Sequence, residues 1–391
     1  MPRTLAALVA ILVTIPATGQ DAAILDDRIS ELVAKHEADI LEFRHYVHQN
    51  PELGNREHET AKRVAAHLTA LGMEVRTGMA HTGVVGILKG GKPGRTIAVR
   101  AAVQYGVASI LAEMRDEIPG TVVFIFQPAE EGPPEGEEGG ADLMVREGVF
   151  DDPKPEAVFG LHTLAGMPVG DVGFTAGPAL AAVDQFRATV RGVQTHGAQP
   201  QQGVDPIVMA SQAVLALQTI VSRNVHPLEP AVVTVGMFHS GARFNIIPAE
   251  VKLEGTVRTY DPDVRDLIER RMNEILGGIT SAGGGSYVLD YERGTPATIN
   301  DTELTAQMAP SLGAVLGTDR VQEILPTMGG EDFAYFALEV PGFFYRLGIH
   351  KEGSVIGPHH SPTFRADDAS VPVGMRVMSN VLMDYLLANA P

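Results

Sequence analysis

The chain has 391 residues, a length that favours two domains over one compact hydrophobic core. Hydrophobic residues make up 45% and charged residues 20% of the chain, proportions that are ordinary for a soluble globular protein. The formal net charge of −18 argues against nucleic acid and anionic membranes as partners, because both require clustered Lys and Arg.

Residues 1–19 are predicted to be a signal peptide. Arg3 supplies a positive charge, residues 5–15 form an apolar run, and residues 17–19 are the small residues that a signal peptidase needs. The alternative is a membrane anchor, but the apolar run is too short to span a bilayer. A lipid anchor on the mature N-terminus would need a cysteine, and the chain has none. We therefore expect an exported protein, periplasmic or secreted, without a stable membrane anchor, disulfides or thiolate metal ligands.

Helix and strand patterns alternate in residues 20–180. The spacing of apolar residues predicts helices at residues 26–47, 60–71, 107–118 and 141–149. Short apolar runs predict buried strands at residues 84–88, 97–103, 122–126 and 157–161. The alternation resumes at residue 301 and ends in a helix at residues 371–388. This pattern is typical of an α/β domain, here residues 20–180 and 292–391, with a mostly parallel sheet covered by helices.

Residues 181–291 have a different pattern. Strands are predicted at residues 185–191, 231–238, 250–260 and 286–291, and helices at residues 206–222 and 263–279. The resulting order, βαββαβ, is that of a ferredoxin-like α+β sandwich. We therefore expect a small domain inserted into the larger one.

Two adjacent carboxylates, Glu130 and Glu131, follow the predicted strand at residues 122–126, which Pro128 ends. Open parallel α/β sheets build their active sites at the C-terminal ends of their strands. One carboxylate there could bind a metal while its neighbour moves a proton. The alternative is a solvated acidic loop, because further glutamates follow closely. Taken alone, the pair favours this alternative.

Histidines occur at two further places of interest. His162 directly follows the predicted strand at residues 157–161, and His359 and His360 lie in a loop rich in Gly and Pro. Imidazole and carboxylate together are the ligands of a zinc or manganese hydrolase site. The alternative for each histidine is a surface or hydrogen-bonded residue. Because no local spacing matches a His-Glu-x-x-His motif or a zinc finger, spacing alone leaves both interpretations open.

Six motifs, in this order, resemble those of the aminoacylase/carboxypeptidase family of di-metal amidohydrolases, which includes hippurate hydrolases and indole-acetyl-amino-acid hydrolases. They are RHYVHQNPELG (44–54), QPAEEG (127–132), GLH (160–162), FNIIP (244–248), GTVRT (255–259) and GGEDF (329–333). The resemblance runs from about residue 29 to the C-terminus. It implies a fold of the di-metal exopeptidase type, in which the inserted domain is a lid that closes over the substrate and often forms a homodimer.

The resemblance also implies a chemistry and the residues that perform it. The expected substrate is a small-molecule N-acyl amino acid, whose amide is attacked by water activated by divalent metal, zinc or manganese, with two ions in the family. Glu130 matches the general base, and Glu131 matches a metal ligand. The other matched positions are the metal ligands His162 and His360, the carbonyl-polarising lid residue His196 and the substrate-contacting lid residue Asn245. The alternative for His196 is a loop histidine and that for Asn245 is a turn-forming side chain, but the motif context favours the functional roles of both.

The chain departs from the family pattern after Arg100 and Ala101. Family members continue with an Asp-Met-Asp stretch and, some dozens of residues later, a His-Ala-Cys-Gly-His-Asp motif, and both are missing here. A short turn at residues 104–106 is expected to join the strand to the next helix. Because two metal ligands are lost, two functions stay open: a metal-dependent amidohydrolase of reduced activity, and a non-catalytic member that only binds ligands resembling acyl amino acids. A truncated product without function is a third possibility.

Overall fold

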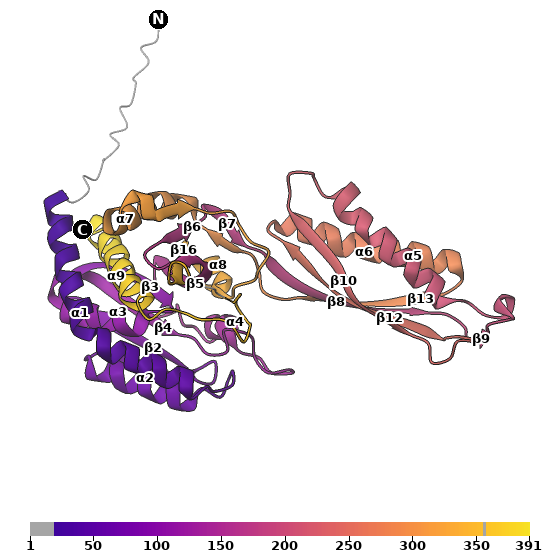
Figure 1. The fold of residues 1–391 in the computed structure, drawn as a ribbon, viewed down its shortest axis with the longest axis horizontal. Helices are drawn as coiled ribbons and strands as arrows, with labels where there is room; N and C mark the ends of the chain where they lie inside the picture. The colour runs from indigo at the N-terminus through magenta and orange to yellow at the C-terminus, as the bar shows by residue number, and fades with distance from the viewer. Residues whose placement is uncertain (1–18, 355–356) are drawn as a thin grey trace, which may run out of the picture.

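The computed structural model describes residues 19–354 and 357–391, so the predicted signal peptide lies almost wholly outside the described residues. Figure 1 shows an elongated molecule. A larger body holds both ends of the described chain, and a narrower body, formed by the middle of the chain, extends from one side of it. No helix in the described ranges combines the length and apolar character that crossing a membrane requires.

The larger body is built on a mixed eight-stranded sheet. Its strands, in spatial order, are β1 (Glu74–Met79), β2 (Gly83–Lys89), β4 (Pro119–Phe126), β3 (Lys92–Ala101), β5 (Ala157–Pro168), β16 (Gly342–His350), β6 (Val172–Phe174) and β15 (Val321–Glu323). The central pairs β4–β3, β3–β5 and β5–β16 are parallel, as is β6–β15, whereas the remaining neighbours are antiparallel. The predicted α/β class with a mostly parallel sheet is therefore confirmed. Strand β1 was missed because its residues are mostly polar and exposed at the sheet edge.

Helices cover both faces of this sheet (Figure 1). One face carries α1 (Gly19–Gln49), α2 (His58–Ala70), α3 (Gln104–Glu113), α7 (Thr302–Leu316) and α9 (Ser370–Ala388), whose buried apolar residues form one cluster with the strands. The other face carries α4 (Gly140–Arg146) and α8 (Phe333–Glu339), which form a second cluster. A short paired segment, β7 (Gly177–Leu180) with β14 (Thr298–Asn300), lies where the chain leaves and re-enters this body.

The junction at which the family motifs are missing is closed by a short connection. Strand β3 ends at Ala101, and α3 begins at Gln104. The Gln104 side chain accepts a hydrogen bond from the Ala101 N–H at 3.1 Å and donates one to the Ile125 carbonyl at 2.6 Å. Gly106 lets α3 approach α9, because a Cβ there would lie 2.2 Å from the Met375 sulfur. A short βα turn is thus present, but at residues 102–103, because the residues predicted as the turn, 104–106, form the first turn of α3.

The narrower body is a four-stranded antiparallel sheet with helices packed against it. Its strands, in spatial order, are β10 (Ala231–Ser240), β12 (Glu250–Thr259), β8 (Ala182–Arg191) and β13 (Ser286–Arg293). The helices are α5 (Pro206–Thr219), which continues as a π-turn (Ile220–Asn224), and α6 (Pro262–Gly283), and their apolar residues pack with the strands in two clusters. Chain order and strand order are those of a ferredoxin-like sandwich, as predicted. Its role as a lid stays a prediction.

Candidate active site

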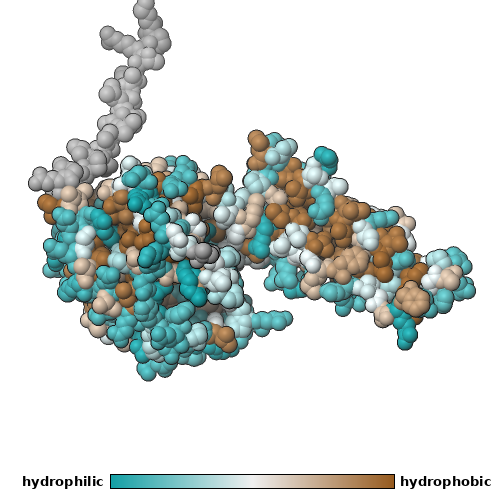
Figure 2. Space-filling model, viewed as in Figure 1, coloured by the Kyte–Doolittle hydropathy of each residue, from teal (hydrophilic) through white to brown (hydrophobic). Residues whose placement is uncertain are grey.

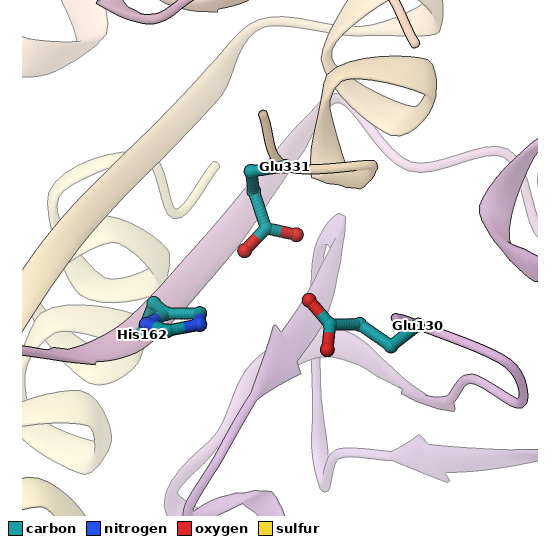
Figure 3. Close-up of side chains that lie close together, drawn as sticks. All are labelled: Glu130, His162 and Glu331. Carbon is teal, nitrogen blue, oxygen red and sulfur yellow. The ribbon is translucent and has the colours of Figure 1, made fainter. Parts of the chain in front are cut away.

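Three side chains meet at the edge of the large sheet where the parallel strands end. Figure 3 shows that Glu130, in the loop after β4, faces His162 of β5 and Glu331, which lies just before α8. One ligand atom from each of the three lies within 4.8 Å of the others. The structure therefore brings together two predicted site residues and one that was not predicted, and this group is a candidate metal site.

Glu130 is directed toward the sheet by the loop that precedes it. Ala129 has a φ of 46°, in the left-handed region that residues with a Cβ seldom adopt. The Ala129 N–H donates to the Glu57 carboxylate at 2.8 Å, so the second helix of the chain holds this conformation. Backbone strain that neighbouring elements maintain is common at functional sites.

His162 was expected just beyond a strand end, but β5 continues through it to Pro168. The strand continues because β16 still pairs with it there, while the pairing of β5 with β3 stops at Leu161. His162 Nδ1 lies 2.7 Å from the Thr163 carbonyl oxygen. Because a carbonyl only accepts, Nδ1 must carry the proton, and the lone pair of Nε2 is available for a metal.

Arg100 of β3 lies among the acidic residues of the site. Its side chain is 9% exposed, and Nη2 lies 3.2 Å from Glu130 Oε1, 2.8 Å from Glu331 Oε1 and 3.0 Å from Asp332 Oδ1. Nε donates to Gln127 Oε1 at 3.0 Å. One guanidinium thus contacts three carboxylates, which compensates part of their charge and leaves the cluster with an excess of negative charge.

Burial and Arg100 together set the protonation of these groups. Burial raises the pKa of Glu130 against the attraction of Arg100, and burial raises that of Asp332 to about 7. Burial also disfavours the Glu331 carboxylate, but the charge of Arg100 and the hydrogen bonds from the Phe333 N–H and Arg100 favour it, so the pKa of Glu331 is lowered. Glu331 therefore stays ionised, whereas Glu130 is better suited than an ordinary glutamate to exchange a proton near neutral pH.

The donor set fits one divalent cation. Imidazole nitrogen and carboxylate oxygen are ligands of the kind that catalytic zinc uses. The excess negative charge around Arg100 favours a cation there. A cavity of about 400 Å³ adjoins the group, lined in part by Glu130, His162 and Glu331.

Glu131 and His360 line the same cavity but lie outside the three-residue group. Both side chains are exposed, and His360 Nδ1 lies 3.8 Å from Glu131 Oε2. The neighbouring His359 accepts a hydrogen bond from the Ala165 N–H at 3.1 Å, which ties this loop to β5. The ligand roles of Glu131 and His360 stay predictions.

His196 and Asn245 lie together, but away from this cavity. His196 belongs to β9 (Thr195–His196), which pairs with β11 (Ile246–Ile247), and the Gly197 N–H donates to the Asn245 carbonyl at 2.8 Å. Figure 1 shows β9 at the end of the narrower body farthest from the large sheet. The structure thus brings these two residues of the narrower body to each other but not to Glu130 within one chain.

Arg100, Glu331 and Asp332 are the residues that sequence reasoning missed. Two of them belong to the GGEDF motif at residues 329–333, where an acidic pair stands between glycines and a phenylalanine. Glu331 and Phe333 are both buried. The sequence signal for these two residues was therefore the acidic pair directly before a phenylalanine. A carboxylate that is buried with such a neighbour needs a charged partner.

Comparison with known proteins places this site in context. The model of peptidase family M20/M25/M40 matches residues 93–384. An IAA-amino acid hydrolase ILR1-like 2 of Arabidopsis thaliana is 33% identical, covering 90% of this chain and 86% of the relative. An N-acetyl-L-cysteine deacetylase of Bacillus subtilis is also 33% identical, covering 90% of each. The crystal structure of Bacillus subtilis YXEP, described as a dinuclear metal binding peptidase, matches with a TM-score of 0.75 and 26% identity, covering 91% of this chain and 99% of that one.

Proposed function

Because the chain belongs to peptidase family M20/M25/M40, we propose that it is a metal-dependent amidohydrolase that cleaves the amide of N-acyl amino acids or similar small amides. The observation that carries this proposal is the convergence of Glu130, His162 and Glu331 at the strand ends. The names of the relatives, which include an amino acid conjugate hydrolase, a deacetylase and carboxypeptidases, support the substrate class.

In this proposal His162 Nε2 and the Glu331 carboxylate would hold zinc or manganese, and Glu130, the third member of the group, serves as the general base. A bound divalent metal supplies Lewis acidity and lowers the pKa of coordinated water. A Glu130 oxygen takes a proton as water attacks the amide carbon, and it returns that proton to the amine nitrogen as the C–N bond breaks. The products are a carboxylic acid and an amine. The raised pKa of Glu130 suits both halves of this proton transfer.

Replacing His162 tests the metal site directly. We expect His162→Ala to weaken zinc or manganese binding by at least about 10- to 100-fold, the loss that removal of an outer-sphere partner alone can cause. Calorimetric titration of the metal-stripped protein measures this, together with metal content and hydrolysis of hippurate and N-acetyl amino acids. His48→Ala, a substitution of an exposed histidine, is the matched control. Unchanged metal affinity in His162→Ala would exclude this group as the metal site.

A non-catalytic, ligand-binding function is the second candidate, and Arg100 is the observation that favours it. Its guanidinium already compensates part of the charge of Glu130, Glu331 and Asp332. A cluster balanced in this way can stay folded without a metal. Binding of N-acyl amino acids without turnover and without tight zinc or manganese uptake, measured by calorimetry, would identify this function.

We also propose a homodimer formed through the narrower body. It exposes large apolar side chains, which are Val208 and Leu215 on α5 and Met237 and Phe238 on the edge strand β10. Figure 2 shows hydrophobic residues gathered on this body. A dimer is one arrangement that brings His196 of one copy to Glu130 of another. Sedimentation velocity tests the assembly, and a monomer at micromolar concentration would contradict it.

Export is proposed from residues 1–19 and is independent of the site. Fractionation of cells that express the full chain tests it. Recovery of an uncleaved chain from the cytoplasm would contradict the proposal.

A further inference from the structure

A second arginine, Arg346 of β16, lines a cavity of about 290 Å³ next to the candidate metal site. His162, Glu331 and His359 line the same cavity. The side chain of Arg346 is partly buried. With residues 19–354 and 357–391 considered, its guanidinium makes no hydrogen bond or ion pair, and the Phe344 ring centroid lies 5.5 Å from its Cζ. Arg346 is therefore a cation without a direct ion pair among these residues, and the charge of Glu331 in the same cavity compensates it only in part.

The strand register places Arg346 at the level of the site. It pairs with His162 of β5 on one side and with Gly173 of β6 on the other. Adjacent strands lie about 4.8 Å apart, so the arginine is one strand removed from the proposed metal ligand. In an N-acyl amino acid only the amide nitrogen and the α-carbon separate the scissile carbonyl from the carboxylate. The separation of the two strands is therefore compatible with the separation of the scissile carbonyl and the carboxylate in such a ligand.

The rest of this cavity is mostly apolar, with Leu164, Phe174 and Leu325 among the lining residues. A partly desolvated cation next to apolar walls suits a ligand that has a carboxylate and an apolar group close together. Arginine is the side chain best matched to a carboxylate, because its planar fork can donate two parallel hydrogen bonds. Burial lowers the pKa of Arg346, but arginine remains charged in proteins.

We propose that Arg346 binds the α-carboxylate of the substrate and that the apolar cavity beside it receives the amino-acid side chain. The acyl group then extends into the cavity of about 400 Å³ that Glu130 lines. This assignment rests on the proposed function for the identity of the substrate as an amide. It makes free N-acyl amino acids with apolar side chains the preferred class, over acyl amino acids whose carboxylate is blocked.

Calorimetric titration of the full protein with two matched ligand pairs tests the assignment. The pairs are hippurate with hippuramide, and N-acetyl-leucine with N-acetyl-leucinamide, and each pair differs only in the carboxylate. We expect the wild type to prefer the carboxylate of at least one pair by about 10- to 100-fold, the worth of a charge-assisted hydrogen bond. Arg346→Met should abolish this preference, and Arg346→Lys should restore part of it.

Two controls separate recognition from structure. Arg365→Met removes an exposed arginine of the nearby loop whose partners within the described ranges are backbone carbonyls, and it should keep the preference. Arg346→Met should keep the thermal midpoint of the wild type, because it breaks no ion pair. Equal binding of both members of each pair by the wild type, no binding of either, or an unchanged preference in Arg346→Met would overturn the assignment. Preference without turnover would instead support Arg346 and refute the amidohydrolase function.

Discussion

Replacing Glu130 with glutamine is expected to lower kcat for hydrolysis of hippurate or N-acetyl amino acids by about 100- to 10,000-fold, the usual contribution of a general base. Glutamine keeps the size of the side chain and its polarity but cannot accept a proton. The group is well placed for this role because burial raises its pKa and it faces His162 and Glu331 across the site. Steady-state kinetics on the metal-loaded enzyme measure the effect.

Glu135→Gln is the matched control, because Glu135 is an exposed carboxylate of the same loop. It should leave kcat unchanged. The metal content of Glu130→Gln distinguishes a general base from a metal ligand. Loss of activity with the metal retained identifies Glu130 as the base, and loss of both activity and metal identifies it as a ligand. Unchanged kcat in Glu130→Gln would refute the mechanism proposed for this site.

Arg100→Met is expected to lower the free energy of unfolding by about 3–5 kcal/mol, the usual cost of removing one partner from a buried ion pair. The substitution leaves Glu130, Glu331 and Asp332 without the cation that all three contact. Denaturation by urea in the presence of a chelator measures the loss without compensation from metal. Because Arg100 is almost fully buried, screening by solvent should reduce this loss of stability only a little.

The loss should depend on pH with a definite sign. The pKa of Asp332 is raised to about 7 in the native protein, so at pH 5 this carboxyl is mostly protonated and needs Arg100 less. At pH 8 it is ionised, and removing Arg100 should cost more. Arg56→Met is the control, because the pair of Arg56 with Glu137 is exposed and such pairs contribute little. A loss below about 1 kcal/mol at pH 8 would show that the cluster does not depend on Arg100.

The fold could be predicted from the sequence because its signals are local. Apolar residues at helical spacing and short apolar runs identify helices and strands from a few neighbouring residues. The order βαββαβ was therefore recognised in residues 181–291, and the α/β alternation around it. The polar edge strand β1 was missed for the same reason, since no apolar pattern marks it.

The site could be predicted only in part. Glu130 and His162 each lie near the end of a strand pairing, a position that a strand pattern can locate. Glu331 comes from a loop far along the chain, and nothing in its local sequence says that it faces them. His196 and Asn245 show the opposite limit. Family motifs identified them, but their position at the far end of the narrower body is set by the length and direction of its strands.

The sequence by itself determined the class of fold, the family resemblance and the chemical character of Glu130 after β4 and of His162 on β5. The tertiary structure decided which charges meet: Arg100 lies among Glu130, Glu331 and Asp332, and Arg346 lies beside the site with no direct ion pair in the described part of the chain. The physical reason is that periodicity and turn propensity act between neighbours along the chain. Electrostatic balance depends on distances between residues more than 200 positions apart, which only the packing of the sheet and its loops establishes.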